Sequence, residues 1–244
     1  MSALQIAPSR VVTREKWLVA RKELKEQEDA AAQTLAELDQ ARQTLPMVAV
    51  AKNYTLIGPD GRTTLLAMFE GRTQLITYHF MFDPAWEAGC RFCSYLVDSI
   101  GDRSHLLARD TTLALVSRAP YDKIAAFRQR MGWNVPWYSS NGSDFNYDFH
   151  VTQDKSKAPF ESIEEKREAL TAMGMPWPVE GEQGGLSVFV QDEGAIFHTY
   201  STHGEGVASL HIVDNYLEFT PQGRPRMEEK ARWLRHHDKY AEKG

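Results

Sequence analysis

The feature that most constrains this chain is a pair of cysteines, Cys90 and Cys93, the only two among its 244 residues. They follow a bulky, largely apolar segment at 73–82 and a short loop, and residues with helical spacing come after them. A C-x-x-C pair that follows a buried strand and opens a helix has the setting that a redox dithiol requires. We therefore expect the chain to fold around a strand that delivers these two thiols.

The spacing of the pair predicts a separate role for each thiol. A redox dithiol needs one exposed, acidified thiol and a second thiol that resolves the mixed disulfide. Cys90 opens the predicted helix, where free backbone N–H groups, the helix dipole and neighbouring Arg91 favour a thiolate. Cys93 lies one turn further along and is expected to be more buried. The sequence predicts that Cys90 attacks, that Cys93 resolves, that Arg91 biases the pair toward oxidation and that no organic cofactor is needed.

Two alternatives use the same cysteines. Zinc would need two further ligands, and the histidines considered are His105, His236 and His237. The last two would reach the dithiol only if the C-terminal helix folded back over it, and we expect them at a solvated helix end instead. The second alternative is a redox-inert binding or assembly module, in which the dithiol is residual and the long helices and aromatic residues make the contacts.

Composition and charge narrow the class of protein. Hydrophobic residues make up 42% and charged residues 25%, which is ordinary for a folded globular chain. The net charge of -5 argues against a nucleic-acid partner. No stretch reaches the roughly 18 apolar residues of a membrane span, and the start, MSALQIAPSRVVTREKW, lacks the apolar segment of a secretory signal. We expect a cytoplasmic protein with no membrane partner, in a reducing compartment where the dithiol is available.

The N-terminal region predicts one long helix over residues 13–45, capped by Thr13 and ended by Pro46. Apolar residues seven positions apart give this helix a narrow stripe, made of Trp17, Leu24, Ala31, Leu38 and Leu45. The stripe is too sparse for a strong coiled coil. We expect the helix to lie against its own domain or to form a homodimer contact.

The rest of the chain alternates strands and helices, which predicts an α/β fold with a central mixed sheet flanked by helices. The expected elements are two strands joined at Pro59-Asp60-Gly61, a central strand at 73–82, a helix at 94–107, a strand at 112–117, a helix at 121–131 and a hairpin turning at Asp192-Glu193-Gly194. The predicted organisation is a helical extension at 1–46, a core domain at 47–223 and a C-terminal helix at 224–244.

An aromatic-rich insertion at about 140–185, with one helix near 163–173, interrupts the core domain. Its aromatic residues and those just before it could wall a substrate groove beside the dithiol. They could equally form a small core of their own. The residues concerned are Trp133, Trp137, Tyr138, Phe145, Tyr147, Phe149 and Trp177.

Three titratable residues lie close to the dithiol in sequence. His79, on the strand before it, could exchange a proton with Cys90, but we favour a buried histidine bonded to a backbone carbonyl. Asp83 and Glu87 could act as proton relays, and we expect them instead to keep the loop solvated.

The approach through residues 54–71 also resembles the entry to peroxiredoxins. That family places a threonine or serine three residues before its peroxide-attacking cysteine and a proline seven before it. Here those positions hold Glu87 and Asp83, and Pro84 is one residue out of register. Glu87 would also repel a neighbouring thiolate. We therefore rank peroxide reduction below thiol–disulfide exchange.

Four stretches together resemble the bacterial domain-of-unknown-function family 899: YHFMFDPAWEAGCRFCS, LARDTTLALVSRAPYDKIAAFRQRMGW, SDFNYDF and FHTYST. The resemblance runs from the N-terminal helix to about Gly223. It implies a thioredoxin-like fold in a peroxiredoxin-like variant and dithiol–disulfide oxidoreductase activity, and it carries a role only to Cys90 and Cys93. The implied partners are an unidentified thiol or disulfide substrate and a cellular thiol reductant.

The chain departs from thioredoxin at one position that matters for this activity. Thioredoxins place a cis-proline just before the strand that faces the dithiol. Here Gly184 and Gly185 precede the corresponding strand, and Pro178 is too far back to take that part. This difference favours a specialised substrate or metal binding over general protein-disulfide reduction.

Overall fold

The computed structural model describes residues 7, 10–154, 156–157 and 181–240 and divides into two compact units, Met1–Pro46 and Met47–Gly244. The first contains the helix α1 (Arg14–Gln43), and Thr13 caps it by accepting a hydrogen bond from the Lys16 N–H. No residue of α1 is buried. The helix expected near 163–173 lies outside the described residues, as do Trp177 and Pro178.

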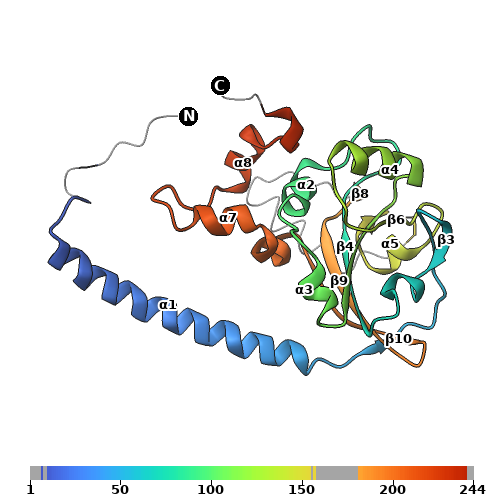
Figure 1. Ribbon diagram of the computed structural model, residues 1–244, viewed down its shortest axis with the longest axis horizontal. Coiled ribbons are helices and arrows are strands. Elements are labelled where there is room, and N and C mark those ends of the chain that lie inside the picture. The colour runs from blue at the N-terminus through green and yellow to red at the C-terminus, as the bar shows by residue number, and fades with distance from the viewer. Residues whose placement is uncertain (1–6, 8–9, 155, 158–180, 241–244) are drawn as a thin grey trace. The chain divides into compact units, whose positions relative to one another are not determined.

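The second unit is built on a mixed sheet. Its strands are β1 (Val48–Ala49), β2 (Thr55–Gly58), β3 (Gly61–Thr64), β4 (Gln74–His79), β5 (Thr111–Ser117), β6 (Trp137–Ser139), β9 (Gly185–Asp192) and β10 (Ala195–His203). Across the described residues they run in the order β1-β10-β9-β4-β5-β6-β2-β3. Figure 1 shows β4 beside β9 within this unit. A separate small pair joins β7 (Thr152–Gln153) to β8 (Gly181–Glu182). The predicted α/β fold with a central mixed sheet is confirmed.

Strand β4 lies at the centre of this sheet, as its apolar sequence predicts. It pairs parallel with β5 and antiparallel with β9, and β9 continues into β10 as an antiparallel hairpin. The hairpin turn places Glu193 and Gly194 at φ 48° and 87°, the left-handed backbone that such a tight turn requires. β4 therefore lies between β5, to which it is joined through helices, and the antiparallel hairpin β9–β10.

The helices of the second unit are mostly short. They are α2 (Arg91–Val97), α3 (Ser104–Leu107), α4 (Tyr121–Arg130), α5 (Phe145–Asp148), α7 (Ile212–Leu217) and α8 (Met227–Trp233), with 3-10 turns η2 (Ala67–Phe69), η3 (Gly204–Leu210) and η4 (His237–Lys239). In the part of the chain that the structure describes, no helix is long and apolar enough to cross a membrane.

Two predicted helices are each divided in the structure. The helix expected over 94–107 forms as α2 and α3, because the chain breaks around Gly101 and Asp102 restarts it by accepting the Ser104 N–H at 2.7 Å. The C-terminal helix expected over 224–244 is helical over α8 and ends there among the described residues. Leu234 then takes an extended backbone and buries its side chain, so the following turn η4 leaves the helix direction.

Two apolar clusters cover the two faces of the sheet. One joins β4 to α2 and α4 and includes Tyr78, Leu96, Phe127 and Trp137. The other lies on the opposite face and includes Leu75, Phe69, Phe145, Phe149 and Phe189. Aromatic residues from in and around the predicted insertion thus belong to both clusters, and Trp137 and Phe145 are fully buried. Trp137 and Phe145 therefore fill the core of the domain rather than wall a groove.

Candidate functional site

The backbone between β4 and α2 holds the two cysteines in place. Cys90 is the residue before α2, and its N–H donates to the Met81 carbonyl oxygen at 3.0 Å. The Cys90 carbonyl oxygen in turn accepts hydrogen bonds from the Ser94 N–H and hydroxyl, both at 2.9 Å. Both thiols are free, with Cys90 half-buried and Cys93 only 1% exposed. The predicted strand-to-helix setting of the pair is therefore present.

Hydrogen bonds acidify the Cys90 thiol. The Cys93 thiol donates to the Cys90 sulfur, and this bond, together with the backbone N–H groups of Cys93 and Phe92, outweighs burial and lowers the Cys90 pKa to about 7. Arg91 acts in the expected direction, but its effect on the Cys90 pKa is smaller than those of the hydrogen bonds. Its guanidinium instead donates to the Ala231 carbonyl oxygen at 2.9 Å.

The second thiol has the opposite surroundings. Burial raises the pKa of Cys93 well above its usual value, and the neighbouring Cys90 raises it further. Two donors act against this: the Met81 N–H, which lies 3.4 Å from the Cys93 sulfur, and the Tyr78 hydroxyl. Cys90 is thus the thiol that ionises near neutral pH, while Cys93 stays protonated.

Tyr78 is a site residue that the sequence reasoning missed. It lies on β4, is 3% exposed and belongs to the same apolar cluster as Cys93. Alternation along β4 places it on the face that packs against α2. A tyrosine with that orientation carries a hydroxyl into an apolar interior, where it needs a partner, and this was the available signal.

The backbone at Gly184 lies directly beside the Cys93 sulfur. A Cβ atom at this position would be 3.8 Å from Cys93 Sγ, 3.9 Å from the Tyr78 hydroxyl oxygen and 3.6 Å from the Met81 methyl carbon. The Gly184 carbonyl oxygen accepts the Gly204 N–H at 3.1 Å. Glycine therefore occupies the position before β9 that faces the dithiol, as the sequence suggested.

His79 and Asp83 have other roles than proton exchange with the dithiol. His79 faces the opposite side of the sheet, where its ring packs on Phe145 and its Nε2 lies 2.8 Å from the Ser187 hydroxyl oxygen. Its expected backbone-carbonyl partner is thus replaced by a serine hydroxyl. Asp83 forms an ion pair with Arg118 at 2.7 Å and is not simply a solvated loop residue.

The C-terminal segment folds back over α2, contrary to the expectation of a solvated helix end. His236 Nε2 lies 2.8 Å from the carbonyl oxygen of Gly89, next to Cys90, and His237 Nδ1 lies 2.6 Å from Asp98. Even so, the described residues contain no group of three or more histidine, cysteine, aspartate or glutamate side chains arranged to hold a metal ion.

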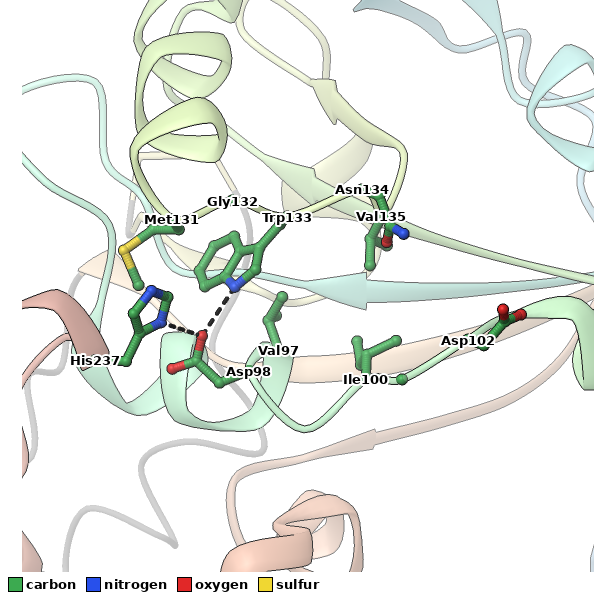
Figure 2. Close-up of a pocket in the computed structure, with 11 residues that line it drawn as sticks. Val97, Asp98, Ile100, Asp102, Met131, Gly132, Trp133, Asn134, Val135 and His237 are labelled. Carbon is green, nitrogen blue, oxygen red and sulfur yellow. Dashed lines mark hydrogen bonds and ion pairs between the residues drawn. The ribbon is translucent and has the colours of Figure 1, made fainter.

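A cavity of about 580 Å³ lies at the other end of α2, and Figure 2 shows its lining. The Asp98 carboxylate there accepts the Trp133 indole N–H at 2.9 Å and binds His237 (Figure 2). Neither Cys90 nor Cys93 contributes to the lining. The cavity is therefore separate from the thiols. Of the aromatic residues considered for a substrate groove, Trp133 lines this cavity.

The strand order around β4 and the dithiol at the start of α2 together define a thioredoxin-like domain. Residues 6–240 match a family described as bacterial protein of unknown function, DUF899. The match covers nearly the whole chain, so the protein belongs to this family. A comparison with curated protein sequences finds no match.

Three of the solved structures with a similar outline have low sequence identity to this chain. The bacterioferritin comigratory protein of Xanthomonas campestris is 14% identical with a TM-score of 0.43, over 70% of this chain and 98% of its own. Peroxidoxin BcpB from Mycobacterium tuberculosis is 11% identical with a TM-score of 0.42, over 69% and 94%. A putative protein disulfide isomerase from Bacteroides thetaiotaomicron is 18% identical with a TM-score of 0.37, over 70% and 91%.

Proposed function

We propose that this protein is a thiol–disulfide oxidoreductase in which Cys90 attacks and Cys93 resolves. The observation that carries the proposal is the asymmetry of the two thiols. Cys90 is half-buried with a pKa of about 7, whereas Cys93 is buried and protonated and donates to the Cys90 sulfur. At neutral pH the first thiol is a ready nucleophile, and the second is placed to reach only a disulfide formed on the first.

The proposed reaction proceeds through one mixed disulfide. The Cys90 thiolate attacks a substrate disulfide, forms a bond to one substrate sulfur and releases the other as a thiolate. Cys93 then attacks the Cys90 sulfur, the second substrate sulfur leaves as a thiolate, and the Cys93 proton passes to a departing thiolate. The protein loses two electrons and the substrate gains them. The same steps in reverse oxidise a substrate dithiol.

The partners that this chemistry requires are few. They are a thiol or disulfide substrate and a cellular thiol reductant that restores the dithiol. The sulfur atoms of Cys90 and Cys93 carry both electrons, so the reaction requires no organic cofactor. A reducing cytoplasm would keep the pair in the dithiol form. The net charge of -5 is consistent with a protein that binds neither nucleic acid nor an anionic membrane surface.

A redox titration tests the proposal directly. The protein is equilibrated in glutathione buffers of graded ratio, alkylated and weighed by mass spectrometry, and we expect one reversible two-electron transition between dithiol and Cys90–Cys93 disulfide. If no intramolecular disulfide forms at any ratio, the redox-inert alternative replaces the proposal. Stoichiometric zinc in protein purified without added metal would instead support the metal-binding alternative.

Single substitutions separate the two roles. Cys93→Ser should trap a stable mixed disulfide with glutathione on Cys90, because the resolving thiol is gone, while Cys90→Ser should form almost none. Cys93→Ser also changes the hydrogen bond that lowers the Cys90 pKa, so the pH dependence of the Cys90 reactivity is measured on the wild type. Its alkylation rate at Cys90 should rise with a midpoint near pH 7, and a midpoint near the ordinary value of about 8.5 would contradict the assigned role.

A further inference from the structure

The resolving sulfur is buried in an apolar cluster, yet it must become a thiolate to close the disulfide. Cys93 is 1% exposed and packs among apolar side chains such as Leu96 and Phe80. A thiolate in such surroundings is costly unless hydrogen-bond donors face it. The groups that act on this sulfur include Cys90, the Met81 N–H and the Tyr78 hydroxyl. Of these, Cys90 is consumed in the mixed disulfide and no longer carries a charge or a proton.

Packing keeps Tyr78 in the same apolar cluster as the Cys93 sulfur. Tyr78 is anchored in the central strand, where its register partners are Leu115 on β5 and Leu186 on β9. Both its hydroxyl oxygen and the Cys93 sulfur lie just under 4 Å from the same point, the Cβ position of Gly184. Because residue 184, just before β9, is glycine, it places no side chain at the point that both atoms approach.

We propose that Tyr78 is a catalytic residue of the dithiol, whose hydroxyl donates a hydrogen bond to the Cys93 sulfur and stabilises the thiolate that closes the disulfide. This inference rests on the proposed oxidoreductase function. The Cys93 proton passes to the departing substrate thiolate, and Tyr78 keeps its own proton throughout. Burial and the neighbouring thiols raise the pKa of Tyr78 well above its usual value, so the hydroxyl stays a donor at neutral pH.

The test uses one equivalent of an aromatic disulfide, dithiobis-nitrobenzoate, whose released thiolate is coloured. The first release reports attack by Cys90, and the second reports resolution by Cys93, so the two steps are seen separately in one stopped-flow trace. In Tyr78→Phe we expect the first rate to stay within about twofold of the wild type. The second rate should fall by about tenfold, the effect of one hydrogen bond to a charged group, and its pH midpoint should rise.

Tyr54→Phe is the matched control, because Tyr54 is also a buried tyrosine, with its hydroxyl bonded to Asp148 on the other face of the sheet. It should change neither rate. Equal slowing of both phases in Tyr78→Phe, or an unchanged second phase and pH midpoint, would overturn the role of Tyr78. A wild-type protein that never releases the second coloured thiolate would overturn the dithiol function itself, so the two failures are distinct.

Discussion

His79 is a buried base that folding keeps neutral. It is 1% exposed, its Nε2 contacts the Ser187 hydroxyl, and its Nδ1 has no hydrogen-bond partner among the residues that the structure describes. Burial and the neighbouring His203 and His198 lower its pKa to about 3, far below the usual value. The unfolded chain therefore binds a proton at His79 once the pH falls below about 6.5, whereas the folded chain does not.

This difference predicts acid sensitivity. The unfolding free energy should fall as pH drops from about 6.5 toward 3, by up to about 1.4 kcal/mol per pH unit from this group. His79→Gln should flatten this dependence of the unfolding free energy on pH, measured by urea denaturation at a series of pH values. Part of the dependence should remain, because burial also lowers the pKa values of His198 and His211. The exposed His105 provides a control, and His105→Gln with the same effect as His79→Gln would contradict the assignment.

At the scale of elements, a buried ion pair attaches α8 to the rest of the domain. Lys230 on α8 is 4% exposed and bonds Asp214 on α7, which is 2% exposed and also accepts the Tyr95 hydroxyl of α2 at 2.8 Å. Three helices thus meet at one carboxylate. Removing the lysine charge leaves that carboxylate buried with fewer donors, which costs far more than losing a surface pair.

Lys230→Met keeps most of the side chain and removes only the charge. We predict a loss of about 3 kcal/mol in unfolding free energy by urea denaturation. Arg224→Met is the control, because Arg224 pairs with the exposed Glu218 at 2.7 Å and should cost less than about 1 kcal/mol. Similar losses in both variants would show that the Lys230 pair behaves as a surface contact. Adding Asp214→Asn to Lys230→Met should restore part of the loss.

Elements with a clear local signal could be predicted from the sequence. The apolar run of β4 predicted a central strand, and Gly194 predicted a tight hairpin turn. The spacing of Cys90 and Cys93 indicated the start of a helix. The C-terminal segment could not be predicted, because Leu234 leaves the helix to be buried and His236 contacts the Gly89 carbonyl oxygen, far away in the chain. Tyr78 was missed for a similar reason, because its partner Cys93 comes near it only when α2 packs on β4.

At the scale of the whole molecule, α1 is 30 residues long and carries exposed apolar side chains, among them Trp17 at 51%, Leu24 at 49% and Leu38 at 47%. One apolar side chain in every seven residues is too sparse for a strong coiled coil, but it leaves an exposed stripe that a second helix would cover in a weaker contact. We propose that α1 forms a homodimer by pairing with α1 of a second copy.

Leu24→Glu with Leu38→Glu should convert this dimer to monomer, because four buried carboxylates would face one another across the two-fold interface. Analytical ultracentrifugation of the full chain measures the change. Lys22→Glu, on the opposite side of the helix from Leu24, alters the net charge by the same amount and should leave the dimer intact. A wild-type protein that sediments as a monomer at all accessible concentrations would remove α1 as a dimer contact.

Gly184 gives the domain a position where the surroundings of one sulfur can be changed without changing the fold. A methyl group there would meet Met81, Cys93 and Tyr78 at ordinary contact distances, and the backbone would not need to move. The residue at 184 is therefore a tuning position for protein engineering. Gly184→Ala would add packing beside the Cys93 sulfur without displacing it, and under the proposed oxidoreductase function this would shift the reduction potential of the dithiol within an unchanged scaffold.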